Sequence, residues 1–222
     1  VDLEAILTCS TAVNRQEFGF SSQDVVLIYV GRLAPEKNLP FLMRAFKGVA
    51  SAYDNARLLL VGDGPEKDNL QDSVVHMGIA NKVHFTGMVP HPEVPCYMTT
   101  ADAFVISSTS ETFGISVVEA MAAGLPVLGI DSPGTRDIIV DGKTGFLSSD
   151  DLASFTAKMA RLVSEHELRR QMGVTAFSAS QTYDIRITTQ SIIQQYLKLI
   201  EGSRSRKNGL RVRINRFFDF WR

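Results

Sequence analysis

The chain is poor in cysteine, and the two cysteines that it has lie far apart in the sequence. Cys9 and Cys96 stand alone among 222 residues. Two such thiols provide neither the framework of a disulfide-rich protein nor a metal cluster, and neither suggests a catalytic nucleophile. We therefore expect an ordinary protein of the reducing cytoplasm.

Long apolar runs and metal-binding patterns are missing as well. No stretch is long enough to cross a bilayer and there is no signal peptide, although the sequence begins at Val1 rather than Met. There is no Asp-x-Asp motif, and the histidines lack cysteine neighbours and ligand spacing: His76, His84, His91 and His166. We expect no metal site. Nucleic-acid binding is not expected either, because the body of the chain is acidic and its basic stretch, Arg204 to Arg222, is short.

Short apolar runs alternate with helical segments along most of the chain. The strand-like runs are Val25–Val30, Arg57–Gly62, Val83–Phe85, Ala103–Ser107 and Pro126–Ile130, with Gly145–Leu147 as an edge strand. The helical segments include Leu39–Tyr53, and Leu152–Val163, Glu165–Met172 and Ile185–Ile200 are expected to cover one side. This alternation predicts an α/β fold with a doubly wound, Rossmann-like parallel sheet, in which ligands bind at the carboxyl ends of the strands.

A pair of carboxylates flanks the segment after the fourth predicted strand. Glu111 lies in the loop and Glu119 lies eight positions later inside a helix, so a rise of ~1.5 Å per residue separates them by roughly 12 Å. One elongated ligand can touch both. Gly114 permits close approach, and the N–H groups of Ile115 and Ser116 at the helix start are expected to face an anion.

Two basic residues follow the first predicted strand. Gly31 ends that strand, and Arg32 and Lys37 stand five positions apart before Asn38, a residue typical of helix caps. Two fixed cations over a helix start favour a diphosphate. Ordinary solvated loop residues are the alternative interpretation.

A third motif, Val61-Gly62-Asp63-Gly64-Pro65, follows the second predicted strand. It lacks the third glycine of a dinucleotide fingerprint and has proline where a helix would start, which argues against hydride transfer. Two segments that follow the fifth predicted strand have compositions typical of turns: Ser132-Pro133-Gly134-Thr135-Arg136-Asp137 and Asp141-Gly142-Lys143-Thr144-Gly145.

Together these motifs resemble the retaining glycosyltransferases of the GT-B fold, of the family 4 type (glycosyl transferases group 1). The resemblance covers about Val25 to Ile200 and corresponds to the C-terminal half of a GT-B architecture, which carries a Glu-x7-Glu motif with Phe-Gly inside it. The family's usual Gly-Gly-x-x-Glu is replaced here by Pro133-Gly134 and Asp137, which leaves the role of that acid open.

The resemblance implies a role for each matching residue. Arg32 and Lys37 neutralise the leaving diphosphate, Glu111 lies by the donor sugar, and Glu119 accepts hydrogen bonds from the ribose. The remaining donor-binding residues form three groups. The glycines of the two turns are Gly31, Gly62 and Gly64, and the segment that contacts the base contains Met88 and Val89. The segment around the sugar and β-phosphate is Thr112, Phe113, Gly114, Ile115 and Ser116. Apolar loop residues such as Met88 and Val89 are also common in cores.

The resemblance further implies a hexosyltransferase that needs no metal and no cofactor, with a nucleotide sugar as partner and UDP-hexose preferred over GDP-mannose. The acceptor would attack from the face of the departing phosphate, which would act as base. An N-terminal acceptor-binding domain is missing from the chain. A nucleotide-sugar-binding module without transfer activity and a GT-B-fold sugar-nucleotide epimerase remain open, whereas a phosphorylase would need a lysine for pyridoxal phosphate.

We predict three regions: a linker with a short segment at 1–24, the donor-binding domain at 25–203, and a basic aromatic tail at 204–222. Between Arg204 and Arg222 there are seven basic residues and one acidic residue, interleaved with aromatic and aliphatic side chains. Such a tail can touch an anionic membrane surface, although it can equally be disordered or dock on an absent domain. The expected place is the cytoplasm, with the inner membrane face as an option.

Overall fold

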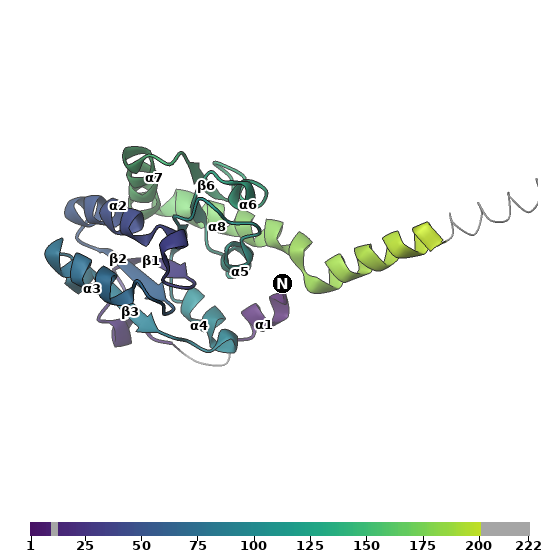
Figure 1. Ribbon diagram of the computed structural model, residues 1–222, viewed down its shortest axis with the longest axis horizontal. Helices are drawn as coiled ribbons and strands as arrows, with labels where there is room; N and C mark the ends of the chain where they lie inside the picture. The colour runs from purple at the N-terminus through teal and green to yellow at the C-terminus, as the bar shows by residue number, and fades with distance from the viewer. Residues whose placement is uncertain (10–12, 201–222) are drawn as a thin grey trace, which may run out of the picture. The chain divides into compact units, whose positions relative to one another are not determined.

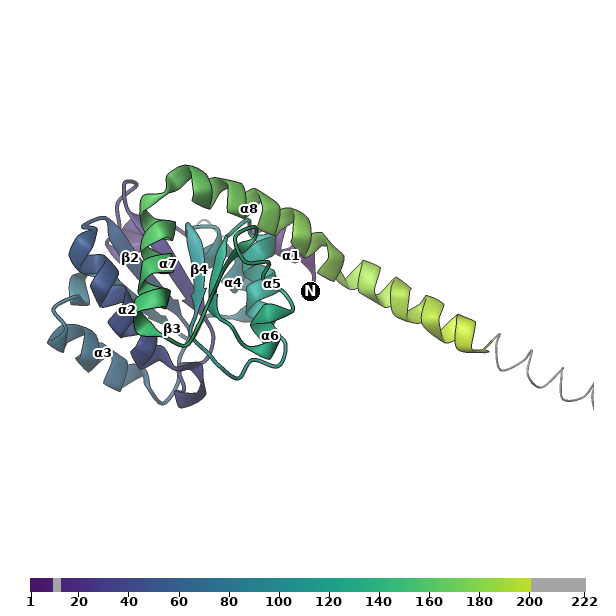
Figure 2. The same ribbon diagram turned by 90° about the horizontal axis from the view of Figure 1, so that it is seen from above.

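The computed structural model describes residues 1–9 and 13–200, and it contains one parallel sheet with helices on both sides (Figures 1 and 2). The chain divides into a first unit, Val1–Gln181, and a second unit, Thr182–Arg222. The sequence instead predicted boundaries after residues 24 and 203, and the whole predicted tail, 204–222, lies outside the described residues.

The sheet has six strands in the order β3-β2-β1-β4-β5-β6, and all pairs are parallel. The strands are β1 (Val25–Val30), β2 (Ala56–Val61), β3 (Val83–Gly87), β4 (Ala103–Ile106), β5 (Val127–Ile130) and β6 (Gly145–Ser148). Their apolar residues are buried because helices cover both faces of the sheet, as a doubly wound fold requires. The predicted α/β fold class is confirmed. The strand order reverses between β1 and β4, where such folds form a crevice.

Helices α2 (Leu39–Ala52) and α7 (Leu152–Ser164) pack together, and α3 (Lys67–His76) adjoins α2. Phe41 of α2 and Phe155 of α7 meet edge to face at 5.3 Å between ring centroids. Buried residues of both helices share one core cluster with β1 and β2. Burial of this kind stabilises by roughly 1.5–3 kcal/mol per large apolar side chain, which anchors β1 and β2 below the loops that follow them.

A second set of helices packs around α5 (Ile115–Ala122): α1 (Leu3–Leu7), α4 (Val94–Met98) and α8 (His166–Ser180). The remaining short elements are α6 (Pro133–Arg136) and the 3-10 turns η1 (Arg15–Phe18), η2 (Pro35–Lys37), η3 (Ala80–Lys82), η4 (His91–Glu93) and η5 (Gln181–Tyr183).

The first residues of the chain are packed, although the sequence suggested a linker there. Leu3 and Ile6 of α1 are buried against Ala122 of α5. Arg15 binds the Asp102 carboxylate at 3.1 Å and so fixes the segment before β1. Sequence periodicity missed this segment because α1 has only five residues.

The expectation for the cysteines is wrong. Cys9 and Cys96 form a disulfide that links the N-terminal segment to α4, across 87 positions of the sequence. The inference of a reducing cytoplasm from unpaired thiols therefore loses its basis.

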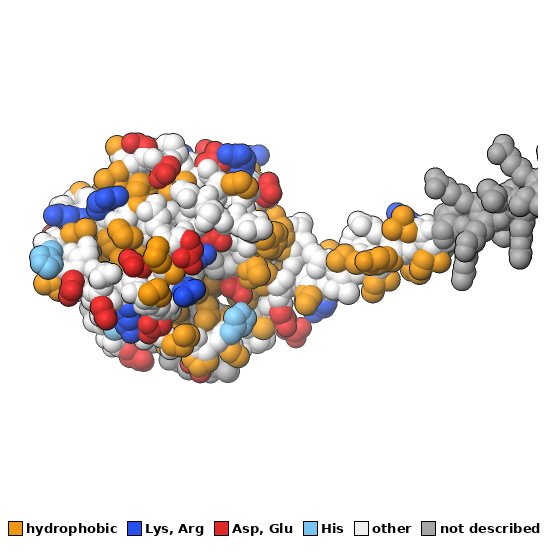
Figure 3. All heavy atoms as spheres, viewed as in Figure 1, with side chains coloured by type: hydrophobic (Ala, Val, Ile, Leu, Met, Phe, Trp, Pro, Cys, Tyr) orange, Lys and Arg blue, Asp and Glu red, His pale blue; other side chains and the backbone are white. Residues whose placement is uncertain are grey.

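The second unit begins at Thr182, and its described part, residues 182–200, consists of the end of η5 and a helix over residues 185–200. Figure 3 shows hydrophobic side chains along this helix. Its large hydrophobic residues are exposed within the described chain: Ile185, Ile187, Ile192, Ile193, Tyr196, Leu197, Leu199 and Ile200. No described helix is long and apolar enough to cross a membrane.

Candidate functional site

The turns that follow β1, β2 and β3 are tied together through their main chains. The Gly31 N–H donates to the Val61 carbonyl at 3.0 Å, and the Gly62 N–H donates to the Gly87 carbonyl at 3.1 Å. Leu33 donates in the same way to Asp63 at 2.9 Å. The carboxyl ends of three neighbouring strands therefore form one continuous backbone surface.

Two glycines are required by this close approach. A Cβ atom on Gly62, which has φ 139°, would lie 2.0 Å from the Gly31 carbonyl oxygen. A Cβ on Gly64 would lie 2.3 Å from the Leu33 carbonyl oxygen. No side chain fits at either position, so the Gly-x-Gly turn predicted at the end of the second strand is a packing necessity.

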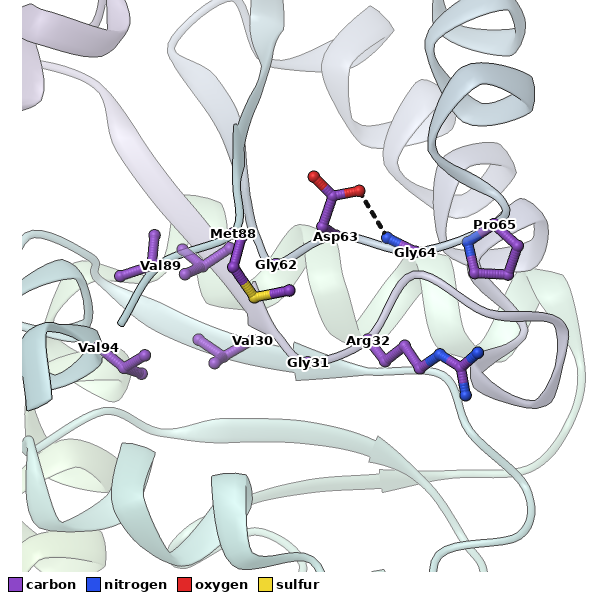
Figure 4. Close-up of a pocket in the computed structure, with 11 residues that line it drawn as sticks. Val30, Gly31, Arg32, Gly62, Asp63, Gly64, Pro65, Met88, Val89 and Val94 are labelled. Atoms are coloured by element: carbon purple, nitrogen blue, oxygen red, sulfur yellow. Dashed lines mark hydrogen bonds between the residues drawn. The ribbon is translucent and has the colours of Figure 1, made fainter. Parts of the chain in front are cut away.

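A cavity of about 560 Å³ opens over this surface (Figure 4). Its lining includes six residues predicted for the donor site: Gly31, Arg32, Gly62, Gly64, Met88 and Val89. Five other lining residues were not assigned to the donor site, although Val61, Asp63 and Pro65 belong to the third motif: Val30, Val61, Asp63, Pro65 and Val94. Val30 and Val61 end their strands, which could have marked them, whereas nothing in the sequence marks Val94. Met88 is 79% exposed, so it lies at the surface and does not belong to the core.

Asp63 is the carboxylate in the wall of this cavity. Its Oδ1 accepts the Gly64 N–H at 2.8 Å, the bond drawn in Figure 4, and its Oδ2 binds Lys67 Nζ at 2.9 Å. The Lys67 hydrogen bond, with help from Gly64, lowers the pKa of Asp63. The neighbouring lysine therefore offsets the repulsion that this carboxylate would exert on a bound phosphate.

Arg32 reaches the cavity from a turn that a buried tyrosine holds. The Tyr29 hydroxyl donates to the Arg32 carbonyl at 2.9 Å. Burial raises the pKa of Tyr29, and the charges of Glu111 and Glu36 raise it further, so this hydroxyl keeps its proton. The Arg32 side chain itself is exposed at the edge of the cavity, where it can meet an anion (Figure 4).

Lys37 and Glu111 meet, although 74 positions separate them in the sequence. The Lys37 Nζ donates to Glu111 Oε1 at 2.7 Å, and the two side chains are only 25% and 13% exposed. The sequence placed both near a diphosphate but did not predict that they pair. An ammonium has three donors, so Lys37 can hold Glu111 and still donate to a ligand.

Residues that the sequence analysis left without a role hold this pair in place. The Ser107 hydroxyl, at the end of β4, is within 2.9 Å of the Lys37 carbonyl and 3.0 Å of the Asn38 carbonyl. The Gly134 N–H donates to the Glu111 carbonyl at 3.0 Å, and a Cβ on Gly134 would lie 2.4 Å from that oxygen. Serines after a strand and a lone glycine are common in turns, so neither carried a usable signal.

The start of α5 differs from the prediction in one respect. The Ile115 N–H, expected to face an anion, donates to the Phe113 carbonyl at 2.9 Å. Gly114 is the N-cap residue, and Ser116 is half-buried in the first turn. Thr112 is exposed, as are Phe113 (51%) and Ile115 (55%), so this stretch presents a surface between the carboxylates.

Glu119 lies one turn before the end of α5, and His91 of η4 faces it. The Glu119 Oε1 is 3.5 Å from His91 Nε2, with side-chain exposures of 15% and 86%. Burial raises the pKa of Glu119, while His91 and the α-amino group of Val1 oppose the rise. A half-buried carboxylate with an exposed, weak partner is suited to accept hydrogen bonds from ligand hydroxyls.

In the part of the chain that the structure describes, no three His, Cys, Asp or Glu side chains gather in a way that could hold a metal. Arg32 lines the cavity, Lys67 pairs with Asp63 in its wall, and Lys37 lies in η2, which follows Arg32 in the sequence. Such cations can donate hydrogen bonds to a diphosphate.

The sequence matches the family described as "Glycosyl transferases group 1" over residues 10–178. It is 35% identical to the sulfoquinovosyl transferase SQD2 of Arabidopsis thaliana, covering 82% of the chain and 35% of that protein. It is 30% identical to the N-acetyl-alpha-D-glucosaminyl L-malate synthase of Bacillus anthracis, covering 88% of the chain and 50% of the relative. The chain thus spans half or less of the length of these relatives.

Solved structures share the fold. The C-terminal domain of LpcC from Francisella tularensis, a glycosyl transferase group 1 protein, matches with a TM-score of 0.73 at 22% identity, over 83% of this chain and 99% of that one. Anabaena Alr3699/HepE, solved with UDP and glucose, matches with a TM-score of 0.77 at 24% identity, over 89% and 55% of the two chains. The family match, the parallel sheet and the glycine turns at its carboxyl edge agree: the chain belongs to the glycosyl transferases group 1 family and has the fold of a GT-B C-terminal domain.

Proposed function

We propose that the first unit is the donor-binding domain of a retaining, metal-independent hexosyltransferase that takes a nucleoside diphosphate sugar, with UDP-hexose preferred. The observation that carries this proposal is that two cations follow β1 and two carboxylates follow β4, the neighbouring strands at which the sheet order reverses. Arg32 lines the cavity, Lys37 pairs with Glu111, and Glu119 lies half-buried on the adjoining helix. The ligand would lie across the β1–β4 reversal, from the cavity to α5.

The diphosphate is assigned to Arg32 and Lys37. Each presents donors to a dianion, and preorganised cations stabilise the charge that develops as the glycosidic bond breaks. Lys37 is held by Glu111 at 2.7 Å, so its position is set before the ligand arrives. Such preorganisation lets the ammonium act without a conformational cost at the moment of reaction.

We assign the ribose to Glu119 and the base to Met88 and Val89. The half-buried Glu119 would accept hydrogen bonds from the ribose hydroxyls and exchange its contact with His91 for them. Met88 and Val89 offer an apolar wall and main-chain groups to the base. The Anabaena protein and a pneumococcal O-GlcNAc transferase of the same fold were both solved in complex with UDP, which supports uracil as that base.

The donor sugar would then lie by Glu111, along the exposed Thr112–Ile115 backbone. The acceptor would attack from the face of the departing phosphate, whose oxygen would take the proton of the acceptor hydroxyl. The hexose would be transferred with its anomeric configuration retained, and the nucleoside diphosphate would leave with its charge on Arg32 and Lys37.

Transfer itself would need a second domain, because the chain spans half or less of its relatives' length. A cleft between domains aligns acceptor and donor, and this positioning can supply roughly 7–11 kcal/mol of barrier reduction. We therefore propose that residues 1–222 bind the donor but do not transfer by themselves. A binding module without transfer in any context and a GT-B-fold epimerase are the competing functions.

Calorimetric titration of the chain with UDP and GDP tests the proposal, together with assays of donor hydrolysis and transfer. We expect UDP binding, tighter than GDP binding, and negligible turnover. A longer chain with a preceding Rossmann-like domain should gain multiple-turnover transfer. Conversion of the donor to an epimer by either chain would favour the epimerase, and absence of nucleotide binding would overturn the proposal.

A further inference from the structure

A second cavity, of about 480 Å³, lies at the amino ends of β4 and β5, on the edge of the sheet opposite to the donor site. Asp102 and Pro126 line it, and they immediately precede β4 and β5. One wall is a face of α8 that carries Arg169, Arg170, Val174 and Phe177. We refer to it as the amino-edge cavity.

Arg169 is buried at this cavity, with 8% of its surface exposed. Its Nη1 donates to the Leu162 carbonyl at 2.7 Å and to the Val163 carbonyl at 3.2 Å, at the C-terminus of α7. Within the described residues, its Nε and Nη2 make no hydrogen bond. Two guanidinium nitrogens of a nearly buried arginine, with three N–H donors between them, are therefore left for a ligand, in the fork that suits phosphate and carboxylate oxygens.

Asp102, a carboxylate that lines the same cavity, is already engaged by other groups. Asp102 binds Arg15 at 3.1 Å and also accepts the Val26 N–H at 2.8 Å. Burial lowers the pKa of Arg169, and the charge of Arg15 lowers it further against the effect of Asp102. The charge of Asp102 favours the charged form of Arg169, but this carboxylate is already engaged by Arg15. A bound anion would give Arg169 a partner of its own.

The rest of the lining combines apolar side chains with further polar groups, among them His166 and a second arginine at the rim. Leu125 is buried at the floor, and Val174 and Phe177 are 60% and 36% exposed on the α8 wall. Arg170 lies beside them and is paired with the exposed Glu167 at 2.7 Å. A ligand that suits this lining has an anionic head for the arginines and a small apolar body.

We propose that the amino-edge cavity binds an organic phosphate monoester, with its phosphate on Arg169 and its apolar part against Leu125, Val174 and Phe177. The volume is in the range of small-molecule sites. Because the cavity lies at the other end of the strands, this ligand binds without competing with a nucleotide at the carboxyl edge. The same chemistry occurs in a soluble phosphate ester and in the headgroup of an anionic lipid.

Calorimetry with the full chain separates these sources. Phenyl phosphate is the soluble probe, and dihexanoyl phosphatidic acid below its micelle-forming concentration is the lipid probe. Inorganic phosphate tests the phosphate group without an apolar part. We expect saturable binding of at least one organic probe, and inorganic phosphate should bind about tenfold more weakly because it lacks the apolar body. The tighter of the two organic probes identifies the source.

Two variants localise the binding. Arg169→Gln should weaken it by about tenfold or more, because it removes the charge-assisted hydrogen bonds. Arg169 also caps α7, so Arg169→Gln can reduce stability as well as binding. Val174→Glu is therefore a second variant: it places a negative charge on the exposed rim, and we expect a comparable loss of affinity for the organic phosphate. Val75→Glu is the matched control, because Val75 is a 65% exposed helical valine of α3. It should bind as the unmodified chain does.

The proposal is overturned if neither organic probe binds, if inorganic phosphate binds as tightly as both, or if Val174→Glu and Val75→Glu have equal affinities. UDP should leave the affinity for the organic phosphate unchanged, and competition between them would also contradict a separate site. Failure of UDP to bind at all would count against the donor-binding function and not against this cavity.

Discussion

The two halves of the candidate donor site are built in different ways. The first half, the turns after β1, β2 and β3, is made of main chain: glycines approach one another closely and hydrogen bonds join the turns. The second half, the loop after β4 together with α5, presents side chains, among them Glu111 and Glu119. Lys37 connects the halves through its 2.7 Å ion pair with Glu111.

This difference indicates that the two halves contribute to binding in different ways. A backbone surface built from glycines fixes shape, and it admits a ligand closely whatever the neighbouring side chains are. The carboxylates of the second half instead recognise hydroxyls and position a cation, which can be changed one side chain at a time. Substitutions in the first half should therefore affect folding and binding together, whereas those in the second half should separate the two.

The largest effect is expected for Gly62→Ala. The new Cβ would meet the Gly31 carbonyl oxygen at 2.0 Å, and the φ of 139° is unfavourable for alanine. We expect a loss of about 3 kcal/mol or more in the free energy of unfolding, together with loss of UDP binding. Urea denaturation measures the first and calorimetry the second.

Gly78→Ala is the control for this variant. Gly78 also has a positive φ, 71°, but its Cβ would meet nothing within 4 Å. It should cost only about 1–2 kcal/mol, the penalty for a left-handed backbone, and leave UDP binding intact. Equal losses in both variants would show that close packing of the turns is not what Gly62 provides.

Lys37→Ala should weaken UDP binding by about 1.5–3 kcal/mol, the range for hydrogen bonds to charged groups. It also leaves the Glu111 side chain, 13% exposed, without its cation, so the free energy of unfolding should fall as well. The double variant Lys37→Ala/Glu111→Gln should recover stability without recovering binding. Recovery of both would mean that Lys37 serves only the ion pair. Lys47→Ala, an exposed lysine of α2, is the neutral control.

Arg32→Ala should weaken UDP binding by a similar ~1.5–3 kcal/mol while the free energy of unfolding changes little, because the side chain is exposed. Thermal denaturation of the free chain and calorimetry with UDP give the two quantities. An unchanged affinity in both Arg32→Ala and Lys37→Ala would remove these cations from the site.

Glu119→Gln should weaken binding of UDP but barely affect the 2′-deoxy analogue, which lacks one of the hydroxyls that Glu119 would bind. Equal losses for both nucleotides would assign Glu119 to folding or to general electrostatics. The comparison needs only calorimetry with the two ligands, and it isolates the contribution of one carboxylate in the second half.

The same variant has the smallest expected effect on stability, with a defined pH dependence. Burial raises the pKa of Glu119 above its ordinary value of 4.5, so the ionised carboxylate disfavours the folded state above the folded pKa. Below the unfolded value the group is neutral in both states and this cost is gone. Glu119→Gln should therefore raise the melting temperature near pH 7, and the gain should vanish as the pH falls below about 4.5. A gain that is constant with pH would contradict this origin.

The parts of the fold that follow from local rules were predictable. The apolar runs of β1 and β2 and the glycines of the first half have steric causes that show in the sequence itself. The pairings that depend on the folded chain were not. Nothing local indicates that Lys37 meets Glu111 or that Cys9 joins Cys96, because 74 and 87 positions separate the partners.

The N-terminal segment and the contacts that support Glu111 were missed for a related reason. Helix α1 is too short for a periodic pattern, and its packing on α5 depends on tertiary contact. Gly134 looks like an ordinary turn glycine until its approach to the Glu111 main chain is seen. The individual residues of the donor site were placed by motif resemblance, and their ligand contacts stay predictions.

The most direct test of the account is an NMR titration of the ¹⁵N-labelled chain with UDP. We predict saturable amide shifts in both halves of the site: at Gly62, Gly64 and Met88 in the first, and at Gly114 and Ser116 in the second. Val174, at the amino-edge cavity, should not respond. Shifts confined to one half, or centred on α8, would contradict a nucleotide that lies across the β1–β4 reversal.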